Sequence, residues 1–406
     1  MKRIHLLWAC LPLMVGTMSC ERNIENNPTP PQEAIAPVVR YMSSQLIPDQ
    51  YIVVLKAPAE SQVDPTTLPF DESQTYMKQE VDRILERNGL ASRSPLHVYG
   101  KTVRGFSITL NSNELEALRQ DAEIEYIEQD QIVALAPGNG RGPGGGGGGG
   151  TPPPQSTPWG ITRVGGSGSG SGKTAWIIDS GVDQDHPDLN VDQGRSVSFL
   201  GGKDANNPDD QNGHGTHVAG TIAAIDNTEG VIGVAAGATV VAVRVLDRRG
   251  SGSLSGVIAG VNHVAGNAGA QDVANMSLGG GISTTLDNAV ISASNTCKFV
   301  LAAGNDGINA NNSSPARANG NNIFTVSAMD NNDVMAYFSN YGNPPVDYAA
   351  PGVNVTSCYK DGGYASLSGT SMAAPHVAGI LLLGNITSDG TISGDKDSNP
   401  DLIAHR

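Results

Sequence analysis

The residues TAWIIDSG at positions 174–181 form a short apolar run that ends in a carboxylate, a hydroxyl and a glycine. Similar apolar runs recur later in the chain, and Ala/Gly-rich segments separate them; they occupy residues 240–246, 273–276, 299–303 and 323–328. Short apolar strands that alternate with helical segments indicate a parallel β-sheet that helices cover on both faces. The second part of the chain is therefore expected to have an α/β fold.

The segment before this sheet, residues 48–136, has a different pattern. Its apolar runs predict strands at residues 51–55, 96–99, 103–110 and 124–128. Asp71 is expected to cap a first helix that ends before Gly89, and Ser112 a second helix over residues 112–120. The resulting order, βαββαβ, is that of a small ferredoxin-like α+β unit. Its only histidine is His97, and it contains no catalytic cluster.

Composition and charge divide the 406 residues into segments and exclude two classes of protein. The formal net charge of −15 argues against a protein that binds nucleic acid or an anionic membrane. Glycine is concentrated after residue 137, where seven consecutive glycines and a Pro-rich run indicate a linker. The expected organisation is a signal peptide at 1–20, a disordered tether at 21–47, the α+β unit at 48–136, the linker at 137–157, the α/β domain at 158–394 and a polar, solvated tail at 395–406.

The first residues are typical of a secretory signal. Lys2 and Arg3 precede an apolar stretch over residues 4–15 that is too short to span a bilayer. Residues 17–20, TMSC, resemble a bacterial lipoprotein box, in which Cys20 would carry the lipid. Ordinary secretion without a lipid is the alternative. We therefore expect a secreted protein or one held at the bacterial cell envelope.

Three segments place a reactive side chain beside glycine at a strand end or a helix start. Asp179 ends the apolar run at 174–178, His214 opens a small-residue helix in NGHGTHVAG, and Ser371 opens another in GTSMAAPHVAG. Each residue alone has an ordinary structural interpretation: a capping Asp, a core His or an N-cap Ser. The three segments together, in the order Asp, His, Ser, favour a shared catalytic role.

With these motifs, residues 156 to about 384 resemble the subtilases, the subtilisin-like serine endopeptidases. The preceding unit resembles the subtilase inhibitor I9 propeptide, through residues 51–56, 105–106 and 126–130. The resemblance implies a subtilisin-like sheet, a secreted enzyme made as a self-processed zymogen, and a propeptide that acts as an intramolecular inhibitor. It also implies protein or peptide substrates, and we expect a monomer.

The resemblance and the chemistry of the side chains together assign the catalytic roles. Ser371 would be the nucleophile, His214 the base that removes its proton, and Asp179 the group that orients the imidazole and stabilises its charged form. Asn305, at the end of an apolar strand, would donate to the oxyanion; an ordinary turn Asn after Gly304 is the alternative. This chemistry needs no cofactor.

Two further histidines could be mistaken for functional residues. His214 and His217 are three positions apart, but no Glu lies between them as in the His-Glu-x-x-His zinc motif. A structural role is the better interpretation for His217 and for His376.

Substrate and calcium sites are also implied by the resemblance. Ser277, Leu278 and Gly279 match one edge of the peptide-binding cleft, and Ala302, Ala303 and Gly304 match a wall of its specificity pocket. No charged residue is placed at the pocket base, so we expect a broad preference for apolar side chains. The implied calcium ligands are the side chains of Gln155, Asp188 and Asn227 and the carbonyl groups of Ile225, Glu229 and Val231. Ordinary surface loops of an acidic protein are the alternative.

Two questions stay open at the level of sequence. The resemblance to the propeptide implies a cut near residues 135–138, and we expect it between Leu135 and Ala136, because Pro137 disfavours a cut directly before it. Whether Cys297 and Cys358 pair cannot be decided from their positions. The competing function is a catalytically silent binding protein whose residues 48–136 act as a protease inhibitor.

Overall fold

The computed structural model describes residues 35–40, 45–59, 63–135 and 153–406. The predicted signal peptide with Cys20, most of the predicted tether, Ala136 and residues 137–152 of the predicted linker lie outside this part of the chain. Among the described helices, none has the length and apolar character that crossing a membrane requires.

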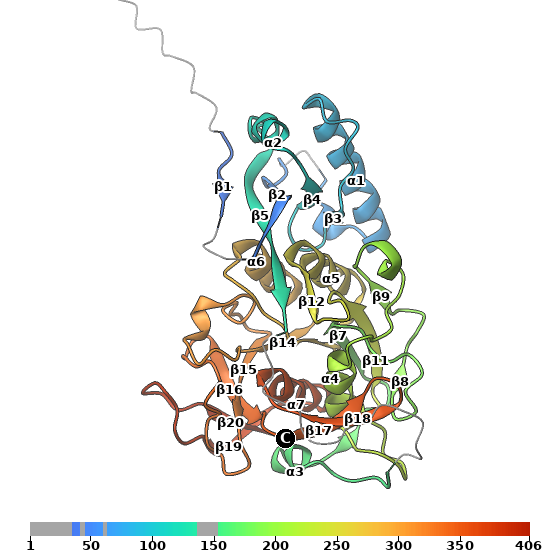
Figure 1. Ribbon diagram of the computed structural model, residues 1–406, viewed down its shortest axis with the longest axis vertical. Helices are drawn as coiled ribbons and strands as arrows, with labels where there is room; N and C mark the ends of the chain where they lie inside the picture. Colours follow the sequence, from blue (N-terminus) through green and yellow to red (C-terminus); the bar gives the residue numbers. More distant parts are fainter. Residues whose placement is uncertain (1–34, 41–44, 60–62, 136–152) are drawn as a thin grey trace, which may run out of the picture. The chain divides into compact units, whose positions relative to one another are not determined.

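The first group of elements has the predicted βαββαβ order with one additional strand before it (Figure 1). Its elements are β1 (Val38–Val39), β2 (Leu46–Leu55), α1 (Phe70–Arg87), β3 (His97–Tyr99), β4 (Gly105–Thr109), α2 (Ser112–Arg119) and β5 (Ile124–Ala134). The strand order in the sheet is β1-β5-β2-β4-β3. Val53 from β2, Met77 from α1 and Phe106 from β4 are fully buried in the core between the sheet and its helices.

The capping residues of both helices differ from the sequence-based prediction. Helix α1 begins directly after Pro69, so Asp71 lies inside the first turn, and the prediction that Asp71 is the cap was wrong. An acidic residue in that turn still interacts favourably with the positive end of the helix dipole. Helix α2 is capped by Asn111, whose side chain accepts from the backbone of Glu114, and Ser112 is the first helical residue. A cap therefore forms one residue earlier than predicted.

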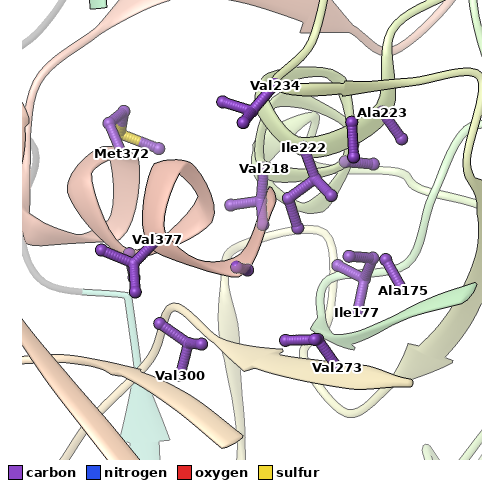
Figure 2. Close-up of a cluster of buried hydrophobic side chains, with 14 of the residues drawn as sticks. Ala175, Ile177, Val218, Ile222, Ala223, Val234, Val273, Val300, Met372 and Val377 are labelled. Atoms are coloured by element: carbon purple, nitrogen blue, oxygen red, sulfur yellow. The ribbon is translucent and has the colours of Figure 1, made fainter. Parts of the chain in front are cut away.

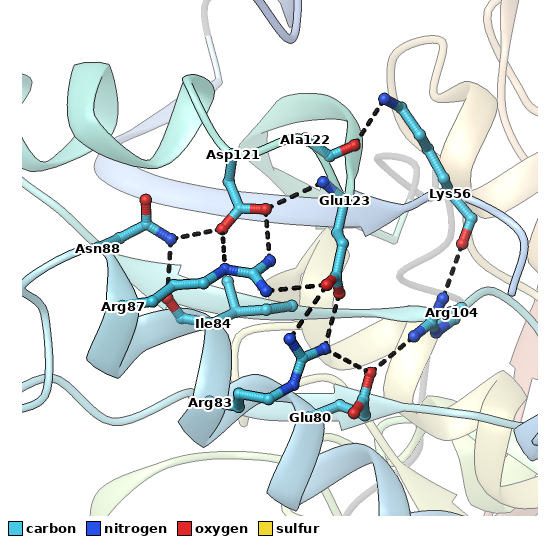
Figure 3. A network of polar contacts seen from close by, with 10 residues as sticks. All are labelled: Lys56, Glu80, Arg83, Ile84, Arg87, Asn88, Arg104, Asp121, Ala122 and Glu123. Carbon is cyan, nitrogen blue, oxygen red and sulfur yellow. Dashed lines mark hydrogen bonds and ion pairs between the residues drawn. The ribbon is translucent and has the colours of Figure 1, made fainter. Parts of the chain in front are cut away.

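A network of ion pairs joins α1 to the start of β5 (Figure 3). Arg83 donates to Glu123 at 2.8 Å, and Arg87 pairs with both Glu123 and Asp121. The hydrogen bond from Arg83 and the contacts with Arg87 outweigh burial and lower the pKa of Glu123 to about 2. The helix is therefore held on the sheet by charged contacts at its exposed edge as well as by the apolar core.

The second group of elements begins after the predicted linker (Figure 1). Its helices are α3 (Trp159–Arg163), α4 (His214–Ala223), α5 (Leu254–Asn267), α6 (Thr284–Ala293) and α7 (Thr370–Leu383). Its strands are β6 (Gly168–Ser169), β7 (Thr174–Asp179), β8 (Asn190–Val191), β9 (Val197–Ser198), β10 (Ala235–Ala236), β11 (Thr239–Arg244), β12 (Ser251–Ser253), β13 (Val273–Met276), β14 (Lys298–Ala302), β15 (Ile323–Met329), β16 (Val346–Pro351), β17 (Val355–Tyr359), β18 (Gly363–Leu367), β19 (Thr387–Thr391) and β20 (Leu402–His405).

The main sheet has the order β19-β20-β16-β15-β14-β13-β7-β11-β8, and all of its pairs are parallel except β19 with β20. Alternate side chains of β7 enter different cores. Ala175 and Ile177 pack with residues of α4 and α7, whereas Trp176 and Ile178 pack with residues of α5 and α6. Figure 2 shows part of the first of these cores, to which Val218 from α4 and Val377 from α7 both belong. Helices therefore cover both faces of the sheet, as predicted.

The end of the chain corrects one expectation. Residues 395–406 were expected to form a solvated tail, but Leu402–His405 forms β20, which pairs in parallel with β16. Asp401 is fully buried and accepts from the hydroxyl of Ser327. The prediction was wrong for these residues because the apolar pair Ile403 and Ala404 is too short to be recognised without its partner strand.

Candidate active site

Asp179 is the last residue of the central strand β7. Its side chain is fully buried, and Oδ1 accepts from the backbone nitrogen of Ser180 at 2.7 Å. The strand runs parallel to β11 and β13. The carboxyl ends of parallel strands form the edge where polar side chains of α/β proteins meet ligands. Asp179 is therefore fixed at that edge by both its strand and its own backbone.

His214 is the first residue of α4 and lies beside Asp179. Its Nδ1 lies 2.8 Å from Asp179 Oδ1. Gly213 precedes it at a φ of 106°, in the left-handed region that favours glycine. At Gly215 a Cβ would collide with the carbonyl oxygen of Gly181, so a glycine there permits the helix to approach the end of β7. The motif glycines therefore place the imidazole against the carboxylate.

Burial and charge act in opposite directions on His214. Burial lowers the pKa of the imidazole, but the negative charge and hydrogen bond of Asp179, followed by the charge of Asp210, outweigh it and raise the pKa. A raised pKa means that the charged imidazole is stabilised relative to water. This is the form that a histidine base adopts after it has taken up a proton.

Ser371 is the second residue of α7. Its hydroxyl donates to the carbonyl oxygen of Ser277 at 3.1 Å, and in the described part of the chain it makes no hydrogen bond with His214. Pro375 lies one turn further along the helix and has no N–H to give to the carbonyl oxygen of Ser371. The hydroxyl of Ser277 donates to that oxygen instead, at 2.8 Å. Ser277 therefore holds the start of α7 in place.

Asn305 follows β14 and has an amide whose orientation is fixed. Its Oδ1 accepts from both the backbone nitrogen and the hydroxyl of Thr370, at 2.8 and 2.9 Å. A backbone N–H can only donate, so the oxygen of the amide must face Thr370. Nδ2 is then the group that can donate elsewhere, and Asn305 lines the same cleft as Ser371.

This cleft has a volume of about 420 Å³. Five of the six residues predicted to bind substrate line it: Leu278, Gly279, Ala302, Ala303 and Gly304. Ser277 is fully buried behind them, where it contacts Ser371. Asp306 also lines the cleft and is the only charged residue among its described lining residues. Sequence reasoning missed it because nothing local distinguishes an Asp that follows Asn305 from a turn residue.

The end of β5 enters this cleft. Its last residues pair antiparallel with β12, with Ala134 opposite Ser251, and Ala134 also bridges to Gly279. The backbone nitrogen of Leu135 donates to the carbonyl oxygen of Gly250 at 2.9 Å. An extended segment that adds to enzyme backbone is the geometry of a bound peptide. The segment before the predicted cut is therefore held as a substrate or product would be.

Two carboxylates of β5 lie at the starts of α5 and α6. Asp130 Oδ1 accepts from the backbone nitrogen of Ser255 at 3.1 Å, and Glu128 accepts from the backbone and hydroxyl of Thr285. Negative charge is favourable at helix N-termini, where backbone N–H groups lack partners. Tyr99 adds a third contact through its hydroxyl, which donates to the carbonyl oxygen of Ser255. The first group of elements is thus bound by polar contacts as well as by the strand in the cleft.

His217 and His376 are fully buried, away from the cleft lining. His217 Nε2 lies 2.9 Å from the carbonyl oxygen of Val355, and His376 Nδ1 lies 2.9 Å from that of Met372. Burial lowers the pKa of His217 to about 3 and that of His376 to about 4. Both side chains are therefore neutral packing residues at neutral pH. The described residues contain no group of three or more His, Cys, Asp or Glu that could hold a metal ion.

The predicted calcium ligands lie in adjacent loops. Asn227 Nδ2 donates to Asp188 Oδ1 at 2.9 Å, and Gln155 Oε1 accepts from the backbone nitrogen of Asn227 at 2.8 Å. Asp188 is almost fully buried, burial raises its pKa, and no described Lys or Arg pairs with it. A Cβ at Gly230 would collide with the Asp188 carboxylate and the hydroxyl of Tyr364. The three predicted side-chain ligands are therefore together, with a buried carboxylate that lacks a cationic partner.

The carbonyl ligands predicted for this set belong to Ile225, Glu229 and Val231. Two backbone hydrogen bonds hold residues 225–231 against Asp188. The backbone nitrogen of Ile225 donates to the carbonyl oxygen of Asp188, and the backbone nitrogen of Val231 donates to its carboxylate. Glu229 bridges to Pro154, next to Gln155. The donor set consists of oxygen atoms only, which suits calcium.

The two cysteines of the described chain are both buried and unpaired. They are Cys297, after α6, and Cys358, in β17. The question left open by the sequence is thus decided: they do not form a disulfide. Burial raises the pKa of Cys297 to about 12, so this thiol stays protonated and inert at neutral pH.

Two family models match the chain. The model of the subtilase family matches residues 170–385, and the model of peptidase inhibitor I9 matches residues 50–136. The first of these covers the segment that holds Asp179, His214, Asn305 and Ser371. The second begins within β2, continues through β5 and ends one residue after Leu135.

Several curated proteases are similar to the chain over most of its length. Alkaline serine exoprotease A of Vibrio alginolyticus is 42% identical over 83% of this chain, which spans 60% of that relative. Alkaline serine protease ver112 of Corniculantispora psalliotae is 35% identical over 93% of this chain and 88% of its own length. M-protease of Shouchella clausii (strain KSM-K16) is 43% identical over 71% of this chain and 70% of its own length.

A solved structure shares the fold. The crystal structure of a cold adapted subtilisin-like serine proteinase matches with a TM-score of 0.53 and 40% identity, over 61% of this chain and 97% of that chain. The family model covers more than half of the sequence, and relatives of known activity align along most of it. The chain belongs to the subtilase family of serine endopeptidases and carries a peptidase inhibitor I9 segment ahead of its catalytic domain.

Proposed function

We propose that the chain hydrolyses peptide bonds with Asp179, His214 and Ser371 as its catalytic triad. The observation that carries the proposal is the hydrogen bond of 2.8 Å between His214 Nδ1 and Asp179 Oδ1. It lies at the end of the central strand, and Ser371 lines the cleft there. Ser371 leaves the carbonyl oxygen of Ser277 and gives its proton to His214 Nε2 as its Oγ bonds to the substrate carbonyl carbon.

Charge and protons balance in the remaining steps. The developing oxyanion accepts from Asn305 Nδ2 and from backbone N–H groups at the start of α7. His214 then donates its proton to the leaving amine, and the acyl group stays on Ser371 until water, activated by the same imidazole, releases it. Asp179 stays ionised throughout and stabilises the imidazolium.

The chain is made, in this proposal, as a secreted zymogen. Residues 48–136 are the propeptide, residues 137–157 the linker and residues 158–394 the core of a monomeric catalytic domain. Three features support inhibition by the propeptide: the end of β5 lies in the cleft, and Asp130 and Glu128 bond to the starts of α5 and α6. The cut between Leu135 and Ala136 stays a prediction, as does the lipid on Cys20, which lies outside the described residues.

We propose a broad preference for apolar side chains in the specificity pocket. Its walls carry small apolar residues, among them Ala302 and Ala303. Asp306 is the one charged side chain among the described lining residues. Of the polar side chains that a substrate could present, its carboxylate would favour the basic ones.

The activity is tested with an active-site probe. A fluorophosphonate labels only a serine that a base has activated, so the purified chain should be labelled and should hydrolyse casein. N-terminal sequencing of the labelled protein locates the cut. A chain that binds peptides but neither reacts with the probe nor hydrolyses casein would instead be the silent binding protein considered from the sequence.

We propose further that calcium is bound by Gln155, Asp188 and Asn227. Subtilases often bind structural calcium. The buried carboxylate of Asp188 without a Lys or Arg partner and the oxygen-only donor set support a cation here. The carbonyl groups of Ile225, Glu229 and Val231 would complete the shell. The ion would join two loops and would take no part in the chemistry.

Removal of calcium should lower thermal stability. A ligand present at 100 times its Kd stabilises the native state by about 2.7 kcal/mol, so we expect EDTA to lower the Tm by about 5 °C or more. Asp188→Asn should have a lower Tm that no longer responds to calcium. Asp192→Asn, at a partly exposed carboxylate paired with Arg195, is the control and should keep the full response. An equal response of all three proteins would refute the assignment.

A further inference from the structure

A second buried carboxylate lies behind the catalytic histidine. Asp210 precedes His214 by four residues, is only 4% exposed and was not among the residues singled out from the sequence. Oδ1 accepts from Ser180 Oγ at 2.9 Å, from the backbone nitrogen of Asn212 at 2.9 Å and from that of Gly213 at 2.8 Å. Oδ2 accepts from the backbone nitrogen and the hydroxyl of Thr216, at 2.9 and 2.7 Å.

Asp210 is the acceptor in all five contacts. Three of the donors are backbone N–H groups, which can only donate. The hydroxyl of Ser180 accepts from the backbone nitrogen of Gly215, and that of Thr216 accepts from the backbone nitrogen of Asp183, so each directs its own hydrogen to Asp210. Burial raises the pKa of Asp210, and the hydrogen bonds of Gly213 and Thr216 oppose that effect. No partner needs a proton from this carboxylate.

These contacts join the two segments that carry the catalytic pair. Ser180 directly follows Asp179, and its backbone nitrogen donates to the same Asp179 oxygen that His214 Nδ1 contacts. Gly213 and Thr216 belong to the start of α4, which has no cap from its own N-cap residue because that residue is Gly213. Asp210 thus performs the capping role for the helix that begins with His214.

The start of a helix is an unfavourable place for a protonated histidine. The positive end of the helix dipole and the unpaired N–H groups destabilise the imidazolium and thereby weaken the base. A carboxylate that binds those N–H groups reverses this effect. We propose that Asp210 is a positioning residue for catalysis, which stabilises the protonated form of His214 and holds the segments of Asp179 and His214 together.

Other titratable groups lie near this site. They are Asp183 after β7, His217 on α4, Arg244 on β11, Tyr359 on β17, and Asp209 and Lys360 in the adjoining loops. His217 and Tyr359 stay neutral at neutral pH because burial lowers the pKa of the first and raises that of the second. The charges that raise the pKa of His214 against burial are those of Asp179 and Asp210.

The test separates charge from geometry with two variants. This inference rests on the proposed function, because it concerns the base of that reaction. Asp210→Asn removes the charge, whereas Ser180→Ala removes the link to the end of β7 and keeps the charge. The pH dependence of kcat/KM is measured per active site, with sites counted by fluorophosphonate labelling.

The direction of the expected shift in the pH profile follows from the protonation state in which His214 reacts. Hydrolysis requires the neutral imidazole, so the acid limb of the profile reports its pKa. Loss of the Asp210 charge lowers that pKa, and the limb of Asp210→Asn should move to lower pH by about half a unit, with kcat about tenfold lower. Ser180→Ala should lose rate without moving the limb. A limb that stays in place in Asp210→Asn overturns the proposal and leaves a structural role.

A second measurement does not depend on maturation. The imidazole of His214 is titrated by NMR in the full-length chain carrying Ser371→Ala, with and without Asp210→Asn. The proposal requires a lower pKa in the double variant, and equal values would refute it. Continued hydrolysis by Ser371→Ala alone would sink the proposed function, while the titration would still report the coupling between Asp210 and His214.

Discussion

Ser371→Ala should abolish both peptide hydrolysis and self-processing. We expect the rate on a peptide p-nitroanilide to fall about 10⁶-fold, which is the scale found when the triad serine of a subtilisin is removed. The propeptide should stay attached, so that denaturing gels show one chain of full length. The physical reason is that the other described hydroxyl at the start of α7, that of Thr370, is already engaged, since it donates to Asn305 and accepts from the backbone nitrogen of Gly304.

The fold should survive this substitution. Among the described residues, the hydroxyl of Ser371 donates to the carbonyl oxygen of Ser277, and only this hydrogen bond is lost. The hydroxyl of Ser277 still donates to the backbone carbonyl oxygen of Ser371, which the missing N–H of Pro375 leaves unpaired. Ser388→Ala, an exposed serine in β19, is the matched control and should process normally. Processing and hydrolysis at the parent rate in Ser371→Ala would exclude this serine as the nucleophile.

Asn305→Ala should reduce kcat with little change in KM. Oδ1 is held by Thr370, which leaves Nδ2 as the donor. In the proposed reaction Nδ2 donates to the oxygen that becomes negative only as the acyl bond is attacked. A donor that acts in the transition state alone affects kcat. We expect a loss of about 10²–10³-fold, the range found when one oxyanion donor is removed from a subtilisin.

Thr370→Val provides the control for this prediction. It removes one of the two bonds to Asn305 and keeps the backbone N–H that fixes the amide, so the loss of kcat should be about tenfold or less. Steady-state kinetics on one p-nitroanilide compare the three proteins. A higher KM at unchanged kcat in Asn305→Ala would mean that the amide binds the ground state instead.

The catalytic candidates could be identified from the sequence because their surroundings are local. The apolar run at 174–178 predicts a strand whose next residue is Asp179, and small residues around His214 and Ser371 predict helix starts. The structure has β7, α4 and α7 at these positions. Backbone preference and apolar periodicity act over a few residues, so one sequence contains this information.

Asp210 illustrates what a sequence pattern cannot supply. In the sequence it is an acidic residue in a polar loop, with the same appearance as its neighbour Asp209. The role proposed for it depends on its hydrogen bonds with Ser180, thirty residues earlier, and with the backbone of the helix that follows. Only folding shows which of two adjacent carboxylates is buried.

By itself the sequence determined the α/β class, the order of elements in the α+β unit and the residues that are candidates for catalysis. The tertiary structure alone decided that β5 continues from the predicted end at residue 128 to Ala134, and that Leu402–His405 joins the main sheet. The reason is the same in both cases. These strands form because they pair with the backbone groups of β12 and β16, which are distant in the sequence. The residues of a strand do not by themselves specify the partner strand to which it will hydrogen-bond.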